Sequence, residues 1–342
     1  MLPPEPRANP ELVGHDDPAQ ALEEAARSGR MHHAWLIAGP AGVGKATLAY
    51  RFARWLLAGL PPPVPGHAPL FLAPDHPVFR RVAAGAHADL FTLAPSTGAS
   101  GKKEVLRAED ARAAVRFLAH TAAEGGWRVV VMEDAERADN LAVPNILLKT
   151  LEEPPPRTVL LILSSQPDRL LPTIRSRCRR LDLFPLPEPV MAGLLEGWLP
   201  ELPETERAGL ARIADGCPGR ALTLAEGEGL ALQEMVEEVL SQLPRLDPRK
   251  THEIADRVAG RRDAAALSVF MGLLRRELAS ALRQAGRGAS VAPWIAGRSL
   301  AEWSTLWDKL GRLADETERL NLDRKQAVLT GLSWLVPSPA GR

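Results

Sequence analysis

A glycine-rich stretch near the amino terminus, GPAGVGKATLAY at residues 39–50, has the residue types that bind phosphate. Gly39, Gly42 and Gly44 give the backbone the freedom to turn several N–H groups toward one anion, and the positive end of the following helix dipole adds to the attraction. Lys45 stands where an ammonium reaches the terminal phosphates of a nucleotide. The spacing therefore predicts a site for ATP at this loop.

The last position of the pattern is occupied by Ala46, where a serine or threonine is expected. The hydroxyl at that position is a direct ligand of Mg²⁺. Thr47 comes next, but one step along a helix turns a side chain by ~100°, so we expect that its hydroxyl cannot replace the missing ligand. The loop is thus predicted to bind phosphate and to support Mg²⁺-dependent hydrolysis poorly. A loop that no longer binds nucleotide at all is the alternative.

Acidic residues that could complete such a site follow an apolar strand, in VVVMEDAE at residues 129–136. Asp134 can hold Mg²⁺, but Ala135 stands where a glutamate would orient the attacking water. Glu133 precedes Asp134, and alternation along a strand sends its side chain to the opposite face. Since a misplacement of ~1 Å can cost on the order of 100-fold in rate, we expect weak or absent ATPase activity. The alternative is a solvated strand end without a catalytic role.

These motifs must be positioned by strands that alternate with helices. Short apolar runs predict buried parallel strands, and amphipathic spacing predicts the helices between them. We expect strands over 34–39, 89–95, 127–134, 158–165 and 179–185, with helices over 20–30, 47–59, 107–121 and 142–152. This order indicates an α/β fold with a doubly wound parallel sheet.

Three details qualify this assignment. The Pro-rich segment 61–77 and the polar segment 96–103 are predicted to be irregular. Pro144 is tolerable only if the helix over 142–152 begins close to it, with Asp139 or Asn140 helping to cap it.

After Pro185 the sequence changes to helical patterns without a convincing strand. A small helical bundle, interrupted at Gly227 and Gly229, precedes a second bundle from about 245 to 336. In the second bundle Trp303 and Trp307 are four residues apart and share a helix face, which favours core or subunit contacts over base stacking. We therefore predict three domains, at 1–186, 187–240 and 241–342.

Composition and charge exclude several classes of function. The 342 residues include 42 Lys and Arg and 42 Asp and Glu, so any contact with DNA would need a local basic patch. The amino terminus lacks the apolar core of a signal peptide, and no apolar run approaches the ~20 residues of a membrane-spanning helix. The two cysteines, Cys178 and Cys217, are expected to be reduced thiols. We therefore expect a cytoplasmic protein.

The segment 145–187, NILLKTLEEPPPRTVLLILSSQPDRLLPTIRSRCRRLDLFPLP, resembles the clamp-loader branch of the AAA+ ATPases. The combination of LLKTLEEPP, a strand and then IRSRC is far more specific than the phosphate loop. Residues 11–57, 86–95 and 320–329 carry further parts of the resemblance. The family's register also places its acidic pair at Asp134 and Ala135. The implied fold is an AAA+ P-loop domain with a parallel sheet, a small helical lid and an all-α C-terminal collar.

The resemblance implies a subunit of a five-membered ring that opens a sliding clamp and places it on primed DNA. Ala46 and Ala135 favour a stator of the bacterial DNA polymerase III clamp loader, without a polymerase site of its own. The alternative is a gamma/tau-type motor subunit that hydrolyses ATP, whereas a P-loop kinase would leave IRSRC unexplained. The implied partners are the gamma/tau and delta subunits, the clamp and primed DNA.

Arg177, in the Ser-Arg-Cys run of IRSRC, is implied to be an arginine finger that reaches the ATP of a neighbouring subunit. A guanidinium is a fixed, fully charged fork that can stabilise charge on the γ-phosphate in the transition state. Arg175, Arg179 and Arg180 crowd the same place and could instead meet phosphate or acidic neighbours. Without the motif, four arginines beside a strand would be interpreted as a solvated rim.

Two further positions are implied by the family alone. Ser165, with Ser164 and Gln166 beside it, lies where the first sensor residue closes a strand. Arg220, in GCPGRAL, matches the second sensor, an arginine of the helical lid that reaches the subunit's own nucleotide. A solvent-exposed arginine at a helix start is the alternative for Arg220.

The chain departs from the family pattern after the helix that follows the phosphate loop. Related subunits often carry a four-cysteine zinc module there, whereas residues 60–90 contain no cysteine. His67, His76 and His87 lie in this region with Asp75, but their spacing fits no closed zinc pattern. We expect these to be surface loop residues and no zinc to be bound.

Overall fold

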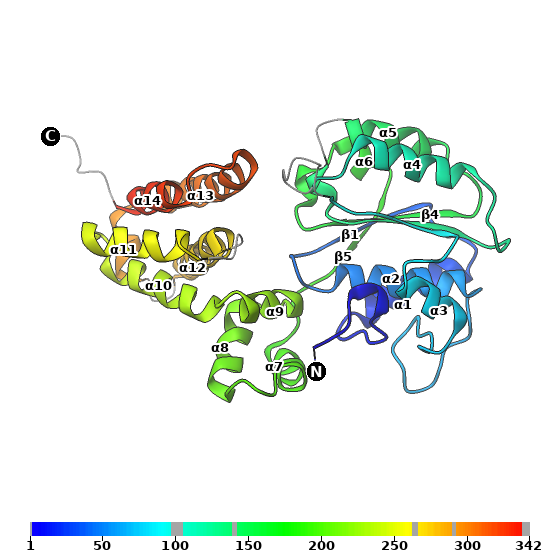
Figure 1. The fold of residues 1–342 in the computed structure, drawn as a ribbon, viewed down its shortest axis with the longest axis horizontal. Helices are drawn as coiled ribbons and strands as arrows, with labels where there is room; N and C mark the ends of the chain where they lie inside the picture. Colours follow the sequence, from blue (N-terminus) through cyan, green and yellow to red (C-terminus); the bar gives the residue numbers. More distant parts are fainter. Residues whose placement is uncertain (1, 97–104, 139–141, 262–265, 289–291, 337–342) are drawn as a thin grey trace. The chain divides into compact units, whose positions relative to one another are not determined.

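Figure 1 shows the fold in a computed structural model, which describes residues 2–96, 105–138, 142–261, 266–288 and 292–336. The chain folds into two compact units, one formed by residues 1–203 and 215–220 and the other by residues 204–214 and 221–342. No helix in the described ranges is long and apolar enough to cross a membrane. The predicted division into three domains remains a prediction.

The first unit is built around a five-stranded parallel sheet with the strand order β2-β3-β4-β1-β5. Its strands are β1 (Ala34–Ala38), β2 (Leu90–Leu93), β3 (Arg128–Met132), β4 (Thr158–Ser164) and β5 (Arg179–Asp182). The three inner strands are buried along their whole length, as expected when both faces of a parallel sheet are covered. The predicted α/β fold with a parallel sheet is confirmed.

Helices cover both faces of this sheet, as Figure 1 shows. One face carries α1 (Asp16–Arg27), α2 (Lys45–Leu57) and α3 (Pro77–Ala83); the other carries α4 (Ala108–Ala119), α5 (Ala142–Glu152) and α6 (Pro172–Arg175). Trp35 and Ile37 pack into the core under α2, whereas Leu36 between them packs into the core under α5. The alternation of side chains along β1 thus feeds two separate cores.

Short helices complete the first unit: η1 (Pro6–Ala8), η2 (Ala135–Arg137), η3 (Pro167–Arg169) and α7 (Glu188–Trp198). The sequence did not predict α3, which follows the Pro-rich segment. The expectation that Pro144 lies close to a helix start is confirmed, because α5 begins at Ala142. The expected caps Asp139 and Asn140, and the predicted polar segment after Ser96, lie outside the described residues.

The histidines after α2 differ from one another in their surroundings. His67 is exposed and stacks on Phe71, and His76 caps α3 by accepting a hydrogen bond from the amide of Val78. The prediction that His87 is a surface residue is wrong: the residue is 4% exposed, and burial lowers its pKa. Over the described part of the chain, no three His, Cys, Asp or Glu side chains are grouped to hold a metal ion.

Two buried arginines of α2 hold the irregular segments on either side of this helix. Arg51 donates to the carbonyl oxygens of Pro10, Ala68 and Pro69 at 2.6 to 2.8 Å. Arg54 donates to two carbonyls in and just after η1 at 2.7 and 2.6 Å. Because a guanidinium carries five donors in a rigid fork, each arginine fixes several carbonyls that no regular structure pairs. These contacts anchor the Pro-rich segment without a metal.

The second unit consists of helices in its described part. They are α8 (Glu204–Ala214), most of α9 (Pro218–Glu226), α10 (Gly229–Gln242), α11 (Pro248–Ala259), α12 (Ala266–Gly286), η4 (Pro293–Gly297), α13 (Leu300–Leu320) and α14 (Arg324–Leu335). The predicted interruption at Gly227 and Gly229 is confirmed, because it separates α9 from α10. Trp303 is 1% exposed and Trp307 donates to the carbonyl oxygen of Arg275, so both serve the core of this unit.

Candidate functional site

The loop between β1 and α2 has the backbone form of an anion site. Gly42 and Gly44 have φ angles of 78° and 115°, a region that residues with a Cβ rarely adopt. Gly44 is the N-cap of α2, and no side chain caps this end of the helix. The first N–H groups of α2, which have no intrahelical partner, therefore point toward the loop together with the positive end of the helix dipole. This part of the site fits a phosphate group.

Lys45 at the start of α2 is turned back onto its own loop. Its Nζ donates to the carbonyl oxygens of Gly39 and Pro40 at 2.7 and 2.9 Å, and to Oγ of Ser165 at 2.8 Å. An ammonium has three donors, so all three are engaged within the chain. The residue is 7% exposed, and burial lowers its pKa, an effect that Glu136 and Asp134 oppose. A phosphate that uses Lys45 must therefore displace one of these contacts.

The first turn of α9 lies directly against the phosphate loop within the first unit. The amide of Gly219 donates to the carbonyl oxygen of Gly42 at 2.8 Å. A Cβ added to Gly42 would lie 2.4 Å from the backbone nitrogen of Arg220. Glycine is thus required at position 42 by this close approach as well as by its φ angle. The structure brings Arg220 beside the loop, which is where the second sensor position was expected.

Ser165 and Glu136 complete the polar surroundings of Lys45. The amide of Ser165 donates to Oε1 of Glu136 at 3.0 Å, while its Oγ accepts from Lys45. The other oxygen of Glu136 is buried and has no hydrogen-bond partner among the described residues. Ser164 is fully buried and its Oγ accepts from the amide of Gln166. Of the two serines, Ser165 is therefore the one that faces the loop.

The acidic residues after β3 point in different directions, as the alternation of the strand predicted. The hydroxyl of Tyr50 in α2 donates to Oε1 of Glu133 at 2.6 Å. Asp134 has a left-handed backbone with a φ angle of 46°, and its Oδ2 lies 4.0 Å from the guanidinium of Arg137. The sequence gave no role to Glu136, although it is the carboxylate that binds Ser165. A glutamate two residues after a strand-ending Asp was the available signal.

Mg²⁺ fits this arrangement less well than phosphate does. Ala46 packs against the apolar core under α2 and offers no oxygen. Glu133 and Glu136 are engaged by Tyr50 and by the amide of Ser165. Asp134 is the remaining carboxylate of the predicted set, and hard divalent cations prefer several oxygen ligands. The loop can hold an anion, but its residues do not form a magnesium site with a hydroxyl ligand.

Arg177 lies between α6 and β5, with its side chain 35% exposed. Its Nη2 is 2.7 Å from Oε1 of Glu152, and its Nη1 donates to the carbonyl oxygen of Thr173 at 3.0 Å. The burial of Arg177 in its own core, which would have excluded a role toward another chain, is not observed. The structure places this residue at the surface and pairs it with a carboxylate that the sequence did not indicate.

The other arginines of this region have separate partners. Arg175 pairs with Asp168 at 2.8 Å, and Arg180 pairs with Asp182 at 2.8 Å. The guanidinium of Arg179 lies 4.9 Å from the ring centre of Trp35. The alternative prediction of acidic neighbours is therefore confirmed for two of these arginines, and Arg179 has an aromatic one.

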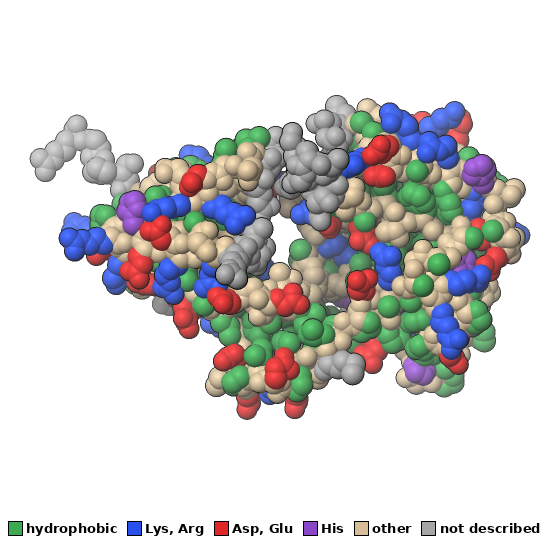
Figure 2. Space-filling model, viewed as in Figure 1, with side chains coloured by type: hydrophobic (Ala, Val, Ile, Leu, Met, Phe, Trp, Pro, Cys, Tyr) green, Lys and Arg blue, Asp and Glu red, His purple; other side chains and the backbone are tan. Residues whose placement is uncertain are grey.

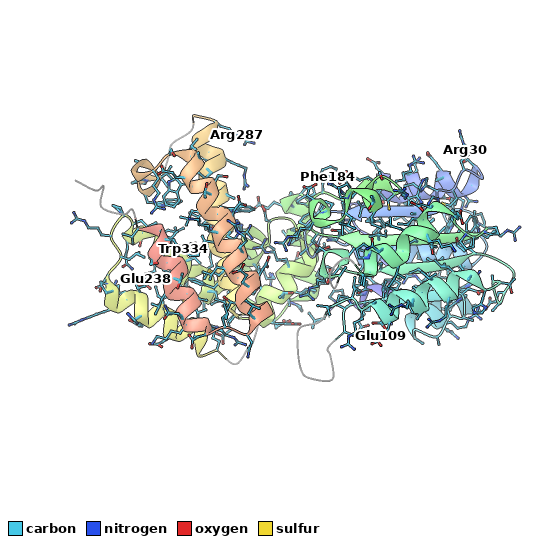
Figure 3. The ribbon with its side chains drawn as sticks, turned by 90° about the horizontal axis from the view of Figure 1, so that it is seen from above. Arg30, Glu109, Phe184, Glu238, Arg287 and Trp334 are labelled. Atoms are coloured by element: carbon cyan, nitrogen blue, oxygen red, sulfur yellow. The ribbon has the colours of Figure 1, made fainter. Side chains whose placement is uncertain are left out.

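Neighbouring residues include a thiol and an exposed aromatic ring. Cys178 is half-buried, and burial raises its pKa to about 12, which makes it a poor nucleophile. Phe184, which follows β5, is 73% exposed and is labelled in Figure 3. Over the visible face of the molecule, Lys and Arg side chains are interspersed with Asp and Glu side chains (Figure 2), in line with the net charge of zero.

The comparisons with known proteins agree on one family. A family model described as "DNA polymerase III, delta subunit" matches residues 14–187, just over half of the chain. A protein of Pseudomonas aeruginosa named DNA polymerase III subunit delta′ is 37% identical over 214 residues, which cover 63% of this chain and 61% of that protein. The subunit of the same name from Escherichia coli is 36% identical over 224 residues, or 65% of this chain and 63% of that protein. The chain thus spans about three fifths of the length of these relatives.

More distant similarities lie in the same group. The DNA polymerase III subunit tau of Escherichia coli is 29% identical over 252 residues, which cover 70% of this chain and 36% of tau. Among solved structures, a protein of Thermotoga maritima described as DNA polymerase III gamma subunit-related superimposes with a TM-score of 0.47 at 18% identity, over 93% of this chain and 98% of that one.

Proposed function

This chain belongs to the DNA polymerase III delta subunit family, and on that premise we propose that it is the delta prime subunit of a bacterial clamp loader. The two relatives named delta′, at 36 to 37% identity, support this assignment. In the proposed role the chain is a stator: it helps the assembly to open the sliding clamp and place it on primed DNA. It works in the cytoplasm with gamma/tau and delta subunits.

The observation that carries the stator role is the use of the two glutamates around Asp134 and Ala135. Glu133 is held by Tyr50 at 2.6 Å, and Glu136 is held by the amide of Ser165 at 3.0 Å. Hydrolysis needs a group that orients the attacking water, and misplacing such a group by ~1 Å can cost on the order of 100-fold. With Ala46 in place of the hydroxyl ligand, the chain binds ATP weakly or not at all and hydrolyses it slowly or not at all.

Arg177 provides the chain's contribution to catalysis in a neighbouring subunit. Its side chain is at the surface, permanently charged, and forked to meet two phosphate oxygens at once. In the neighbour's site water attacks the γ-phosphate while the bond to the β-phosphate breaks, and the guanidinium stabilises the negative charge in the transition state. The chemistry is thus performed by the neighbour's residues, and this chain supplies one charge.

The remaining predicted site residues have supporting roles in this proposal. Gly39, Gly42, Gly44, Lys45, Thr47, Ser165 and Arg220 line a phosphate loop that serves as a structural connection between the sheet and the start of α9. The hydrogen bond from the amide of Gly219 to Gly42 supports such a connection. A lid at 187–240 and a collar at 241–342, which holds the ring together, complete the proposed organisation. No zinc is needed where Arg51 anchors the segment after α2.

The second candidate is a gamma/tau-type motor subunit with Lys45 and Asp134 supporting hydrolysis within the chain. It is favoured by the 29% identity with tau, which extends over 252 residues. Purified chain alone decides between the two candidates. A stator shows no DNA-stimulated ATP turnover, whereas a rate of ~1 s⁻¹ or more, typical of a working enzyme, would exclude it. Reconstitution with gamma/tau and delta subunits then tests membership of the ring.

A further inference from the structure

The two motifs that carry the family resemblance, LLKTLEEPP and IRSRC, meet in the structure through one pair of side chains. Glu152 is the last residue of α5, and its Oε1 lies 2.7 Å from Nη2 of Arg177. On the other side of the same guanidinium, Nη1 donates to the carbonyl oxygen of Thr173 in α6 at 3.0 Å. The guanidinium is therefore held from two helices, one of which is distant in the sequence.

The neighbouring arginines are held differently. Arg180 pairs with Asp182 in its own strand, and Arg175 pairs with Asp168 in the preceding short helix. Both of these acidic partners belong to the same local segment as the arginine, so each pair only fixes that segment. The contact of Arg177 with Glu152 instead ties the arginine to a helix that packs on the sheet. Arg177 thereby gains a reference point in the body of the domain.

Glu152 occupies a position where a carboxylate is electrostatically unfavourable. The carboxyl end of a helix carries a partial negative charge, so the last turn favours cations rather than anions. Arg177 compensates the conflict, because its charge lies 2.7 Å from the carboxylate. When a residue breaks a local rule and a distant partner compensates, a functional reason is the usual explanation.

The pair leaves the guanidinium able to act on a further anion. Glu152 and Thr173 use one donor each, and a guanidinium has five. The side chains of Arg177 and Glu152 are 35% and 51% exposed. Ion pairs that are this exposed are weak, so a triphosphate, which carries several negative charges, can share the guanidinium without a large cost.

We propose that Glu152 is a positioning residue for Arg177: together with the Thr173 carbonyl, it fixes the fork so that it meets a neighbouring subunit's triphosphate already oriented. This proposal deepens the arginine-finger role proposed above and rests on it. A free arginine side chain samples many rotamers, and the lost entropy would have to be supplied in the transition state. The carboxylate of Glu152 removes part of that loss in advance.

The test uses the reconstituted clamp loader with this chain as wild type, Glu152→Gln, Arg177→Ala and the double variant. Glu153→Gln is the matched control, since it removes the same charge at the next position, where the side chain is exposed and makes no salt bridge among the described residues. ATP turnover is measured as kcat and KM in the presence of clamp and primed DNA. Thermal unfolding of each isolated chain is measured in parallel.

We expect Glu152→Gln to lower kcat by about 2- to 5-fold, the range that the strength of an exposed ion pair allows, with KM for ATP unchanged. In the Arg177→Ala background the same substitution has no further effect, and Glu153→Gln matches the wild type. Because a neutral residue suits the end of α5 better, Glu152→Gln does not lower the melting temperature. A purely structural role would lower the melting temperature instead of kcat.

The outcomes separate this inference from the function on which it rests. If Arg177→Ala leaves turnover of the complex unchanged, the proposed finger fails, and the inference fails with it. If Arg177→Ala lowers turnover but Glu152→Gln equals the wild type, the finger stands and only the positioning role is overturned. An equal loss from Glu152→Gln in the presence and absence of Arg177 would overturn it too, because the carboxylate would then act by another route.

Discussion

Nζ of Lys45 lies 2.8 Å from Oγ of Ser165, so the lysine of the phosphate loop and the residue that closes β4 are hydrogen-bonded to each other. Two carbonyls of the loop take the other two donors of the ammonium. In a nucleotide-hydrolysing site this lysine would serve the terminal phosphates. Here the same charge connects the loop to the neighbouring strand.

Lys45→Met is therefore expected to destabilise the isolated chain. It leaves the carbonyls of Gly39 and Pro40 and the hydroxyl of Ser165 with one partner fewer in a buried place, which costs about 1–3 kcal/mol of the free energy of unfolding. Urea denaturation measures this loss. Lys149→Met, at an exposed position of α5, is the control and should change the stability little. Equal stabilities of the two variants would show that Lys45 has no structural role.

Arg177→Ala is expected to lower ATP turnover of the reconstituted complex while the chain stays folded. An arginine finger contributes on the order of 10³-fold at the site that it serves, so the complex should lose the share of turnover that belongs to that site. Steady-state ATP hydrolysis with clamp and primed DNA is the measurement. Arg175→Ala breaks a pair with Asp168 at the same surface and should leave turnover unchanged. A similar fall in both variants would indicate loss of the interface rather than of a finger.

The strands of the sheet were predictable because a parallel sheet covered on both faces produces continuous apolar runs. The predicted strand over 34–39 corresponds to β1 at Ala34–Ala38, and the others agree as closely at their starts or centres. The seven residues of α3 were not predicted. A helix of two turns shows too little periodicity to be separated from the Pro-rich segment before it.

The site was predictable where it depends on local spacing and not where it depends on distant pairs. The loop, Asp134 and Ser165 followed from motifs, but the contact of Glu136 with Ser165 joins two different strand ends. The apolar residues of α2 were identified as a core face, which left Arg51 to be interpreted as solvated. It is 2% exposed because irregular chain covers the outer side of α2, and periodicity does not reveal such a covering.

Tyr50 predicts a specific loss of stability at high pH. Burial, followed by the charge of Glu133 and its hydrogen bond, raises the pKa of this phenol well above its usual value of about 10. The unfolded chain then releases the proton at a lower pH than the folded chain does. The stabilisation is complete below about pH 10 and is lost as the pH rises above it. Tyr50→Phe should therefore show a smaller decrease in stability between neutral and strongly alkaline pH.

The same residue allows a direct measurement, because it is the single tyrosine of the chain. The absorbance of tyrosinate reports its ionisation without interference from another phenol. We expect no tyrosinate in the folded protein at a pH where the urea-unfolded protein is already half ionised. Ionisation of the folded and unfolded chains at the same pH would contradict the buried pair with Glu133. At neutral pH, Tyr50→Phe should cost about 1–2 kcal/mol through the lost hydrogen bond.

Arg51→Ala is expected to release the Pro-rich segment that follows α2. The substitution leaves the carbonyls of Pro10, Ala68 and Pro69 without their shared donor in a place that water does not reach. We expect a loss of about 2–4 kcal/mol in the free energy of unfolding, in the upper range for single substitutions. Limited proteolysis should then cut within residues 61–76, because cleavage requires the backbone to leave the surface of α2.

Arg80→Ala is the matched control, since it removes an exposed arginine from α3 next to the same segment. It should leave both stability and protease resistance close to the wild type. Arg51→Lys tests the geometry: a lysine keeps the charge but is a point donor that cannot span three carbonyls, so it should recover only part of the loss. Full recovery by lysine would mean that charge alone anchors the segment, and unchanged cleavage in Arg51→Ala would mean that the carbonyl contacts do not anchor it at all.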